Sequence, residues 1–152
     1  MKQVEIYTDG ACRGNPGVGG WGAVLVYEAN GRRHEKELSG GEPQTTNNRM
    51  EQTADIEALS ALRDPCRVIL TSDSKYVIDA LTLGWAESWR ARGWKKADKS
   101  PALNPDLWEM LLGLTKKHQI EYVWVKGHDG HPYNERCDRL ATAFADSLKG
   151  TE

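Results

Sequence analysis

Residues 3–9 read QVEIYTD, and this stretch decides the fold. Its apolar residues alternate with polar ones, which predicts a β-strand over Gln3–Thr8 that ends at Asp9. A second short strand, predicted over Arg67–Thr71, ends in the same way at Asp73. Ligands of open α/β sheets gather at the carboxyl ends of strands, so this pair of carboxylates favours a functional site. A single aspartate at a strand end is more often the cap of a turn, and it is the pair that carries the inference.

The rest of the chain alternates between short apolar runs, turn signals and amphipathic stretches. Gly10–Gly20 is predicted to be a loop because it is rich in glycine and contains an Asn15–Pro16–Gly17 turn. Further strands are expected at 21–27, 33–39 and 120–125, and helices at 47–62, 74–92 (broken near Gly84), 104–117 and 133–148. This order predicts a mixed sheet with helices on its faces. The third strand is expected at an edge of the sheet because it offers little to bury.

The composition is that of one globular domain. The chain has 152 residues, a mass of 17.0 kDa and 39% hydrophobic residues, which predicts a single domain over residues 1–150 with its own core. No stretch approaches the ~20 apolar residues of a membrane span, and no apolar leader opens the sequence, so no membrane partner is expected. The three cysteines form no paired motif, which argues against a disulfide framework or zinc site and favours a reducing, cytoplasmic location.

Charge is distributed unevenly, although the net charge is only −2. Residues 1–82 carry 9 basic and 12 acidic side chains, residues 83–100 carry 5 and 2, and residues 101–152 carry 6 and 8. The middle segment also holds three of the six tryptophans, Trp85, Trp89 and Trp94. A basic island with aromatic residues favours nucleic-acid binding, and local packing is the alternative reading for the tryptophans.

The helix expected at 47–62, with Thr46 or Asn47 as its cap, has two acidic residues on its apolar face. At about 100° per residue, Glu51 and Asp55 point into the arc of alanines and leucines. The polar side is expected to hold Gln52, Thr53, Glu57 and Ser60. Buried charges are rare unless they are paired or bind metal, so a functional role is favoured for Glu51, and Asp55 is left open. The alternative is a helix rim that is more exposed than its pattern implies.

A loop at 126–132 follows the last predicted strand and precedes Asp138, which lies at the rim of the apolar stripe of the final helix. A histidine in a loop is usually a solvated side chain. His128 is flanked by glycine and precedes a helical aspartate, which makes it a candidate proton shuttle.

Four segments, in this order and at these intervals, resemble the type 1 ribonuclease H family and its bacterial members most closely. They are YTDGAC with GNPG (7–12 and 14–17), TTNNRME (45–51), SDS (72–74), and WVKGHDGH running on to NERCD (124–131 and 134–138). The resemblance covers nearly the whole chain. It implies an α/β (α+β), ribonuclease H-like fold, with a five-stranded mixed sheet of three antiparallel and then two parallel strands, flanked by helices. It also implies a monomeric enzyme that hydrolyses the RNA strand of RNA–DNA hybrids endonucleolytically.

The family's motif positions imply the metal ligands Asp9, Glu51, Asp73 and Asp138, holding two Mg²⁺ or Mn²⁺ ions. His128 carries over as the residue that helps to deprotonate water or to clear product. The chemistry agrees, because Mg²⁺ prefers oxygen ligands and two ions about 3.5–4 Å apart stabilise both the attacking and the leaving oxygen. Without metal the carboxylates are expected to repel one another, which raises the pKa of at least one of them.

The resemblance further implies three sets of contacts to the hybrid. The residues that would read ribose 2′-hydroxyls in the minor groove are Cys12, Gly14, Asn15, Asn47, Asn48 and Gln52. A phosphate pocket for the DNA strand is expected at Thr46 and Asn104. The basic protrusion near 84–100 would contribute Trp85, Trp89, Arg90, Arg92, Trp94, Lys95, Lys96 and Lys99. Some of these tryptophans are expected in the core.

The sequence departs from the family pattern at positions other than the four carboxylates. Gln44 stands where a basic residue is common beside the phosphate pocket, and Leu103 stands where a lysine often ends the protrusion. The segment around Leu83–Gly84 is longer than is common in bacterial members. Asp55 and Asp129 stand where small neutral residues are usual. These departures bear on hybrid affinity rather than on the chemistry.

Other function classes fit the sequence less well. A junction resolvase or integrase core shares the fold but lacks the segment from His128 to Asp138 and the basic protrusion. A module that binds hybrids without cleaving them would need a lost carboxylate, and all four are present. A purely structural protein leaves the core-facing Glu51 unexplained.

Overall fold

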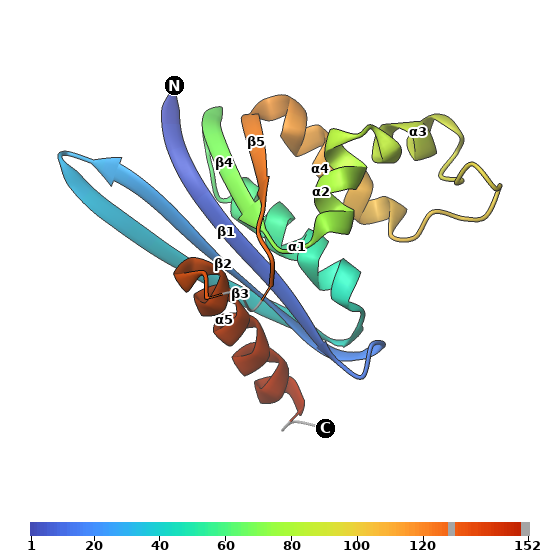
Figure 1. The fold of residues 1–152 in the computed structure, drawn as a ribbon, viewed down its shortest axis with the longest axis horizontal. Helices are drawn as coiled ribbons and strands as arrows, with labels where there is room; N and C mark the ends of the chain where they lie inside the picture. The colour runs from blue at the N-terminus through green and yellow to red at the C-terminus, as the bar shows by residue number, and fades with distance from the viewer. Residues whose placement is uncertain (128–129, 150–152) are drawn as a thin grey trace.

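The computed structural model describes residues 1–127 and 130–149. Its elements, in chain order, are β1 (Lys2–Arg13), β2 (Gly17–Ala29), β3 (Arg32–Thr45), α1 (Asn47–Ser60), β4 (Cys66–Ser72), α2 (Lys75–Thr82), α3 (Trp85–Ala91), α4 (Pro105–Lys117), β5 (Gln119–Trp124) and α5 (Pro132–Lys149). The strands form a five-stranded sheet in the order β3-β2-β1-β4-β5, and helices cover both of its faces (Figure 1). Among the described residues, no helix combines the length and the apolar composition that a membrane span requires.

The strand directions confirm the expected mixed sheet. β1 pairs with β2, and β2 with β3, in antiparallel fashion, whereas β1–β4 and β4–β5 are parallel pairs. In the parallel pair, Thr8 of β1 lies opposite Ser72 of β4. Asp9 and Asp73 are the next residues after this pair, so the register brings the two carboxylates together at the carboxyl end of the β1–β4 pair.

The helices begin and end close to their expected positions. Thr46 caps α1, because its side-chain oxygen accepts a hydrogen bond from the backbone N–H of Arg49. The break near Gly84 separates α2 from α3, and Pro105 stands in the first turn of α4. Asn104 occupies the cap position of α4 as expected, but its side chain makes no capping hydrogen bond.

The expected loop at Gly10–Gly20 is wrong, because most of it is strand. β1 continues to Arg13 and β2 begins at Gly17, so that Gly10 pairs with Trp21 and a short turn remains between the strands. Gly14 lies in this turn with a positive φ, whereas Gly10 and Gly20 serve close packing. A Cβ on Gly20 would overlap the carbonyl oxygen of Ala141, so α5 can lie directly on this part of β2.

β3 is longer than the expected 33–39 and reaches Thr45. Its place at the edge of the sheet confirms the expectation from its polar sequence, and most of its side chains are exposed or half-buried. Because β3 continues to Thr45, it delivers the chain directly to the cap of α1, beside the carboxyl end of β1.

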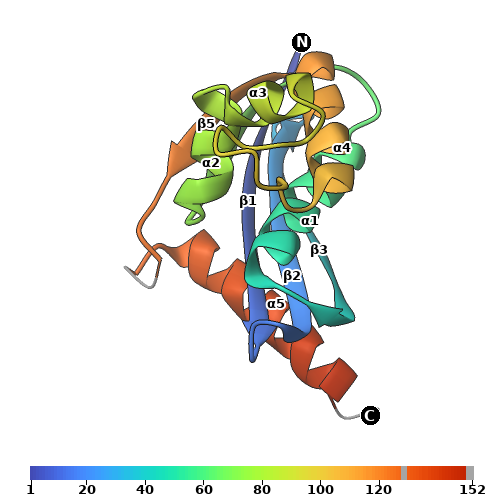
Figure 2. The same ribbon diagram turned by 90° about the vertical axis from the view of Figure 1, so that its right-hand side faces the viewer.

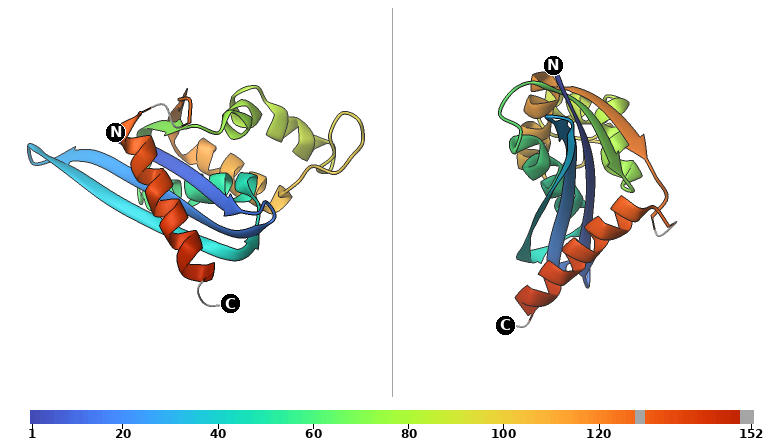
Figure 3. Two further views of the ribbon diagram at one scale, coloured as in Figure 1. Left: turned by 60° about the horizontal axis from the view of Figure 1, so that its bottom comes forward. Right: turned by 90° about the vertical axis from the view of Figure 1, so that its left-hand side faces the viewer.

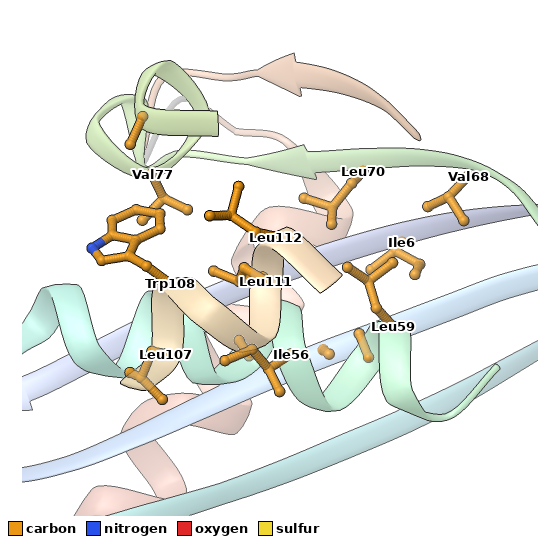
Figure 4. Packing of buried hydrophobic residues seen from close by; sticks show 14 of the residues in the cluster. Ile6, Ile56, Leu59, Val68, Leu70, Val77, Leu107, Trp108, Leu111 and Leu112 are labelled. Carbon is orange, nitrogen blue, oxygen red and sulfur yellow. The ribbon is translucent and has the colours of Figure 1, made fainter. Parts of the chain in front are cut away.

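Two apolar layers hold the sheet between helices. α5 crosses β1, β2 and β3 on one face, and α1 to α4 cover the other face (Figure 2; Figure 3). The larger core lies on the side of α1 and α4. Figure 4 shows Ile6 of β1 beside Leu59 of α1, and Trp108 of α4 beside Val77 of α2, all within one buried cluster. On the other face, a smaller cluster joins Val24 and Val26 of β2 to Cys137 of α5.

The burial of α1 confirms one part of the sequence analysis and corrects another. Glu51 and Asp55 are buried, with 8% and 1% of their surfaces exposed. Gln52, which was expected on the polar side, is fully buried. The physical reason is that α1 packs against β1 and β2 on one side and against α4 on another. Its buried arc is therefore wider than the apolar stripe alone predicts.

Candidate active site

Three carboxylates meet at the carboxyl end of the parallel strand pair. Asp9 comes from β1, Asp73 follows β4 directly, and Glu51 comes from the second turn of α1. Each offers an oxygen, and these atoms all lie within 4.8 Å of one another. Side chains from three separate elements, far apart in the sequence, are thus brought into one group that could hold a cation.

Close backbone approaches keep this group together. A Cβ on Gly10 would lie 2.6 Å from the backbone nitrogen of Glu51, so only glycine lets β1 approach α1 this closely. A Cβ on Gly127 would lie 2.8 Å from Oδ2 of Asp73. The indole N–H of Trp124 also donates to the Asp73 backbone carbonyl at 3.1 Å. The ends of β1 and β4 are therefore held against the elements that carry or border the acidic groups.

Burial and the mutual repulsion of the carboxylates dominate the electrostatics of the group. Burial, with the charge of Asp73 second, raises the pKa of Asp9 to about 8. Burial and the charges of Asp9 and Asp73 also raise the pKa of Glu51 well above its usual range. The expectation that at least one carboxylate pKa is raised is thus confirmed. Within the described residues, Oε2 of Glu51 is buried and has no hydrogen-bond partner.

The donor set fits a hard divalent cation. It consists of carboxylate oxygens, and neither histidine nor thiol belongs to the group of three. Oxygen ligands with several negative charges suit Mg²⁺ or Mn²⁺ better than a softer metal. The orphaned oxygen of Glu51 and the mutual repulsion would both be relieved by a bound cation.

Asp138 lies on α5, at the wall of the same cleft. The cleft is lined by Asp9, Glu51, Asp73 and Asp138 together with neighbouring polar residues, and we call these four carboxylates the acidic cleft. The charge of Asp138 adds to the raised pKa of Asp9, but Asp138 is not one of the three residues whose oxygens are mutually close. His128, the candidate proton shuttle, lies outside the described residues, as does Asp129.

The expected minor-groove residues gather beside the acidic cleft, with one exception. Cys12, Asn47 and Asn48 line the cleft, and Gly14 and Asn15 form the turn between β1 and β2. The side-chain oxygen of Asn15 accepts a hydrogen bond from the backbone N–H of Asn47 at 2.9 Å, which ties this turn to the start of α1.

Gln52 is the exception, and its assignment as a substrate contact is wrong. Its side chain is fully buried, so it cannot reach a ligand in the cleft. Among the described residues, neither atom of its amide has a hydrogen-bond partner. Gln52 lies outside the apolar stripe of α1, but α1 packs against β1, β2 and α4, so its buried arc is wider than that stripe.

Thr46 and Asn104 are brought together by a residue that the sequence analysis missed. The Arg49 backbone N–H donates to Thr46 Oγ1 at 3.2 Å, and its guanidinium donates to Asn104 Oδ1 at 3.3 Å. Arg49 also forms ion pairs with Asp106 and Glu42 at 3.1 and 3.4 Å. The sequence contained a signal for Arg49. A cation in the first turn of a helix interacts unfavourably with the helix dipole, so its presence there indicates a role other than helix stabilisation.

The basic protrusion, residues 84–100, is a compact local structure. The backbone N–H of Trp94 donates to the carbonyl of Trp89, that of Lys96 to Ser100, and that of Ala102 to Trp94, at 2.7 to 2.9 Å. Figures 1 and 3 show the loop after α3 at the periphery, away from the sheet.

The protrusion residues divide into exposed and buried sets. Trp85, Arg92, Lys95 and Lys99 are exposed, and Trp94 and Lys96 are half-buried. Trp89 is buried against Trp108, with their ring centroids 5.8 Å apart, which confirms that some of these tryptophans lie in the core. The reason is that α3 packs on α2 and α4, which places one face of this short helix in the core. The contact of Trp89 with the substrate stays a prediction.

Arg90 differs from the other basic residues of the protrusion. It is half-buried and lies within 3.5 Å of Glu87 and 3.6 Å of Glu109. Its charge is therefore already partly compensated, unlike that of Arg92 or Lys95. Leu103, at the end of the protrusion, is exposed.

Comparison with known proteins agrees with this geometry. A family model described as RNase H matches residues 1–146. A protein of Alcanivorax borkumensis named Ribonuclease H is 58% identical, over 98% of this chain and 95% of that protein. One of Novosphingobium aromaticivorans with the same name is also 58% identical, over 95% of this chain and 98% of that protein.

Solved structures point the same way. LC9-RNase H1, described as a type 1 RNase H with the type 2 active-site motif, superimposes with a TM-score of 0.86 at 34% identity, over 97% of this chain and 74% of that one. LC11-RNase H1, solved in complex with RNA/DNA hybrid, gives a TM-score of 0.67 at 26% identity, over 95% and 97%. With carboxylates at the strand ends, a matching family model and full-length relatives, this chain belongs to the RNase H family, whose enzymes cleave the RNA strand of RNA–DNA hybrids.

Proposed function

We propose that this protein hydrolyses the RNA strand of RNA–DNA hybrids endonucleolytically, with two divalent ions held in the acidic cleft. The observation that carries the proposal is the meeting of Asp9, Glu51 and Asp73, with oxygens within 4.8 Å, beside a surface of asparagine, cysteine and glycine residues. A phosphodiester is an anion, so a protein that cleaves it has to neutralise charge on the substrate and on the attacking water.

Asp9, Glu51, Asp73 and Asp138 are the residues that would hold Mg²⁺ or Mn²⁺. When bound, two such ions supply Lewis acidity and lower the pKa of water. The carboxylates would supply the oxygen ligands. Burial favours the protonated forms of Asp9 and Glu51, and a bound cation would favour their charged forms instead. His128, by its resemblance to the family motif, would help to move a proton or to release product. Gly127 leads the chain past Asp73 just before that residue.

The polar surface next to the cleft would select RNA. This surface is formed by the end of β1 with Cys12, the turn with Gly14 and Asn15, and the start of α1 with Asn47 and Asn48. A minor groove that passes over the acidic cleft would lie within reach of these residues. Amide and backbone groups of this kind can hydrogen-bond the ribose 2′-hydroxyl, which distinguishes RNA from DNA. The cleavage site would therefore face the RNA strand.

The DNA strand would be held further along α1. Thr46, Asn104 and Arg49 form one cluster, in which Glu42 and Asp106 already pair with the guanidinium of Arg49. A phosphate bound here would take over part of this ion pairing. The basic protrusion would extend this contact through Trp85, Trp94, Arg90, Arg92, Lys95, Lys96 and Lys99. Its cations gain free energy by releasing counterions from the nucleic acid.

We further propose that residues 1–150 act as one domain and that the protein works as a cytoplasmic monomer. All the proposed metal ligands and hybrid contacts lie on one chain, so no second copy is needed to complete the site. The three cysteines are free thiols, as expected of a protein in a reducing compartment.

A cleavage assay on labelled substrates tests the function. With Mg²⁺, the protein should cut the RNA strand of a hybrid, and it should leave duplex DNA and duplex RNA intact. EDTA, or the substitution Glu51→Gln, should abolish cleavage. Cutting of branched DNA in preference to the hybrid would support a junction resolvase instead, and hybrid binding without any cleavage would support a binding module.

A further inference from the structure

A buried hydrogen bond joins β1 to α1 directly beside the acidic cleft. The hydroxyl of Thr8 donates to Oδ1 of Asp55 at 2.7 Å, and both residues are buried. The two residues lie 47 positions apart in sequence, so the bond is a tertiary contact between a strand and a helix. Asp55 lies one helical turn beyond Glu51, on the same side of α1.

This bond and a second contact flank Asp9. Thr8 immediately precedes Asp9 and is bonded to α1 through Asp55. Gly10 immediately follows Asp9 and packs against the backbone of Met50 and Glu51, so closely that a Cβ would overlap it. The backbone of Asp9 is therefore held between two fixed points on the helix that carries Glu51.

Among the residues that the structure describes, no ion pair compensates the burial of Asp55. The nearby Arg49 directs its guanidinium to Glu42, Asn104 and Asp106. Burial raises the pKa of Asp55 to about 7, and the hydrogen bond from Thr8 lowers it in part. A small apolar residue would avoid this cost. The polar pair fixes the position of α1 relative to β1. A hydrogen bond depends on direction, so it restricts sliding of the helix along the strand more than an apolar contact does.

We propose that Asp55 is a positioning residue for the metal site: by accepting the hydrogen bond of Thr8 it sets the end of β1 relative to α1, and so the separation of Asp9 from Glu51. This inference rests on the proposed metal-dependent function. Asp55 does not itself touch the cation or the substrate. It acts through Thr8 on the backbone of Asp9.

The test compares variants that keep the bond with variants that remove it. Asp55→Asn keeps an oxygen acceptor without the charge, and Thr8→Ser keeps the donor. Asp55→Ala and Thr8→Val remove one partner each. For every variant, binding of Mg²⁺ is measured by calorimetry without substrate, and kcat, KM for the hybrid and the Mg²⁺ concentration for half-maximal activity are measured with substrate. Circular dichroism checks the fold.

Asp55→Ala and Thr8→Val should each weaken Mg²⁺ binding about two- to tenfold, which corresponds to the free energy of one intramolecular hydrogen bond. The Mg²⁺ concentration for half-maximal activity should rise by the same factor. Cleavage at saturating Mg²⁺ and KM for the hybrid should stay near the parent values. Asp55→Asn and Thr8→Ser should restore Mg²⁺ binding. The double variant Thr8→Val/Asp55→Ala should be no worse than either single change, because both remove the same bond.

Two results would overturn the inference. Folded Asp55→Ala and Thr8→Val proteins with unchanged Mg²⁺ binding would show that the pair only stabilises the fold. A loss in Asp55→Asn as large as that in Asp55→Ala would show that the charge of Asp55 matters rather than its hydrogen bond. If Asp55→Ala fails to fold, Thr8→Val decides the question. Failure of the proposed function is seen separately, because the parent protein would then neither bind Mg²⁺ nor cleave the hybrid.

Discussion

The acidic cleft and the basic protrusion are built in opposite ways. In the acidic cleft, carboxylates from β1, α1 and the end of β4 meet across long separations in sequence and are mostly buried. Close approaches at Gly10 and Gly127 hold them in place. The basic protrusion is held by hydrogen bonds between near neighbours, and Arg92, Lys95 and Lys99 are exposed.

The difference follows from what each region has to do. Like charges that share a cation must stay at a fixed separation, although they repel one another until the cation binds, and only tertiary packing can hold them there. Contacts to phosphates need positive charge near the surface, and such attraction falls off gradually with distance. We therefore expect substitutions in the acidic cleft to act on kcat, and substitutions in the protrusion to act on KM.

The largest effect is expected from removing one charge of the acidic cleft. Asp9→Asn, Glu51→Gln and Asp73→Asn should each lower kcat by about a thousandfold or more, since a lost ligand forfeits several kcal/mol of metal-dependent stabilisation. The fold should remain, because each change is nearly isosteric. Single-turnover cleavage of a labelled hybrid measures the effect. Parent-like cleavage by Asp73→Asn at saturating Mg²⁺ would contradict the assignment of the cleft.

A smaller effect of a different kind is expected from the protrusion. Replacing Arg92, Lys95 and Lys99 with alanine should raise KM for the hybrid about tenfold or more and leave kcat nearly unchanged, because these side chains hold substrate and transition state alike. The slope of log K against log salt should become shallower by about one unit for each phosphate that the variant no longer neutralises.

Two single substitutions serve as matched controls for the protrusion. Lys116→Ala removes an exposed charge at the other end of α4 and should change neither KM nor the salt slope. Arg90→Ala should have a smaller effect than Arg92→Ala, since Arg90 is already paired with Glu87 and Glu109. A salt slope that stays the same in the triple variant would mean that the protrusion does not touch the hybrid.

The comparison also predicts how stability depends on pH without metal. Burial raises the pKa of Asp9 to about 8, so the folded protein keeps a proton that the unfolded chain loses near pH 4. The resulting stabilisation is complete below pH 4 and is lost as the pH rises through about 8. In EDTA, the urea midpoint should therefore fall between pH 5.5 and pH 8.5, measured at constant m.

Asp9→Asn provides the control for this pH dependence. The fall in midpoint should be smaller in Asp9→Asn, because the group that holds the proton is gone. In the parent protein, saturating Mg²⁺ should also make the fall smaller, because the cation favours the ionised form of Asp9. A parent midpoint that falls over this pH range only to the same extent as that of Asp9→Asn would show that the pKa of Asp9 is not raised in the folded state.

The smallest effect is expected at a position that belongs to neither region. Gly113 lies exposed inside α4, and a Cβ there would meet no atom within 4 Å. Gly113→Ala should therefore stabilise the protein by about 0.5–1 kcal/mol through helix propensity, without any change in kcat, KM or salt slope. Urea unfolding measures the gain. A change in kcat would mean that α4 transmits strain to the acidic cleft.

Much of the fold and the centre of the site could be predicted from local patterns. Alternation marked the first part of β1, although the strand runs past its expected end at Asp9 to Arg13, and a short apolar run marked β4 with Asp73 after it. Helical periodicity placed Glu51 and Asp55 on the buried face of α1. These predictions hold because residues three or four apart on a helix, or two apart on a strand, share a face whatever packs against it. Assignment of a metal site then followed from the family motifs.

Only the tertiary structure decided the features that depend on distant partners. Gly20 reads as part of a loop until α5 is seen to lie on it, and Gln52 reads as a surface residue although it is fully buried. Only the packing shows that Trp89 is one of the tryptophans in the core, against Trp108 of α4. The partner of Asp55 is Thr8, which no local pattern connects to it. Sequence periodicity therefore determined which side chains face inward along each element, whereas the width of a buried face and the partner of a buried polar group depend on contacts between elements, which only the packed chain defines.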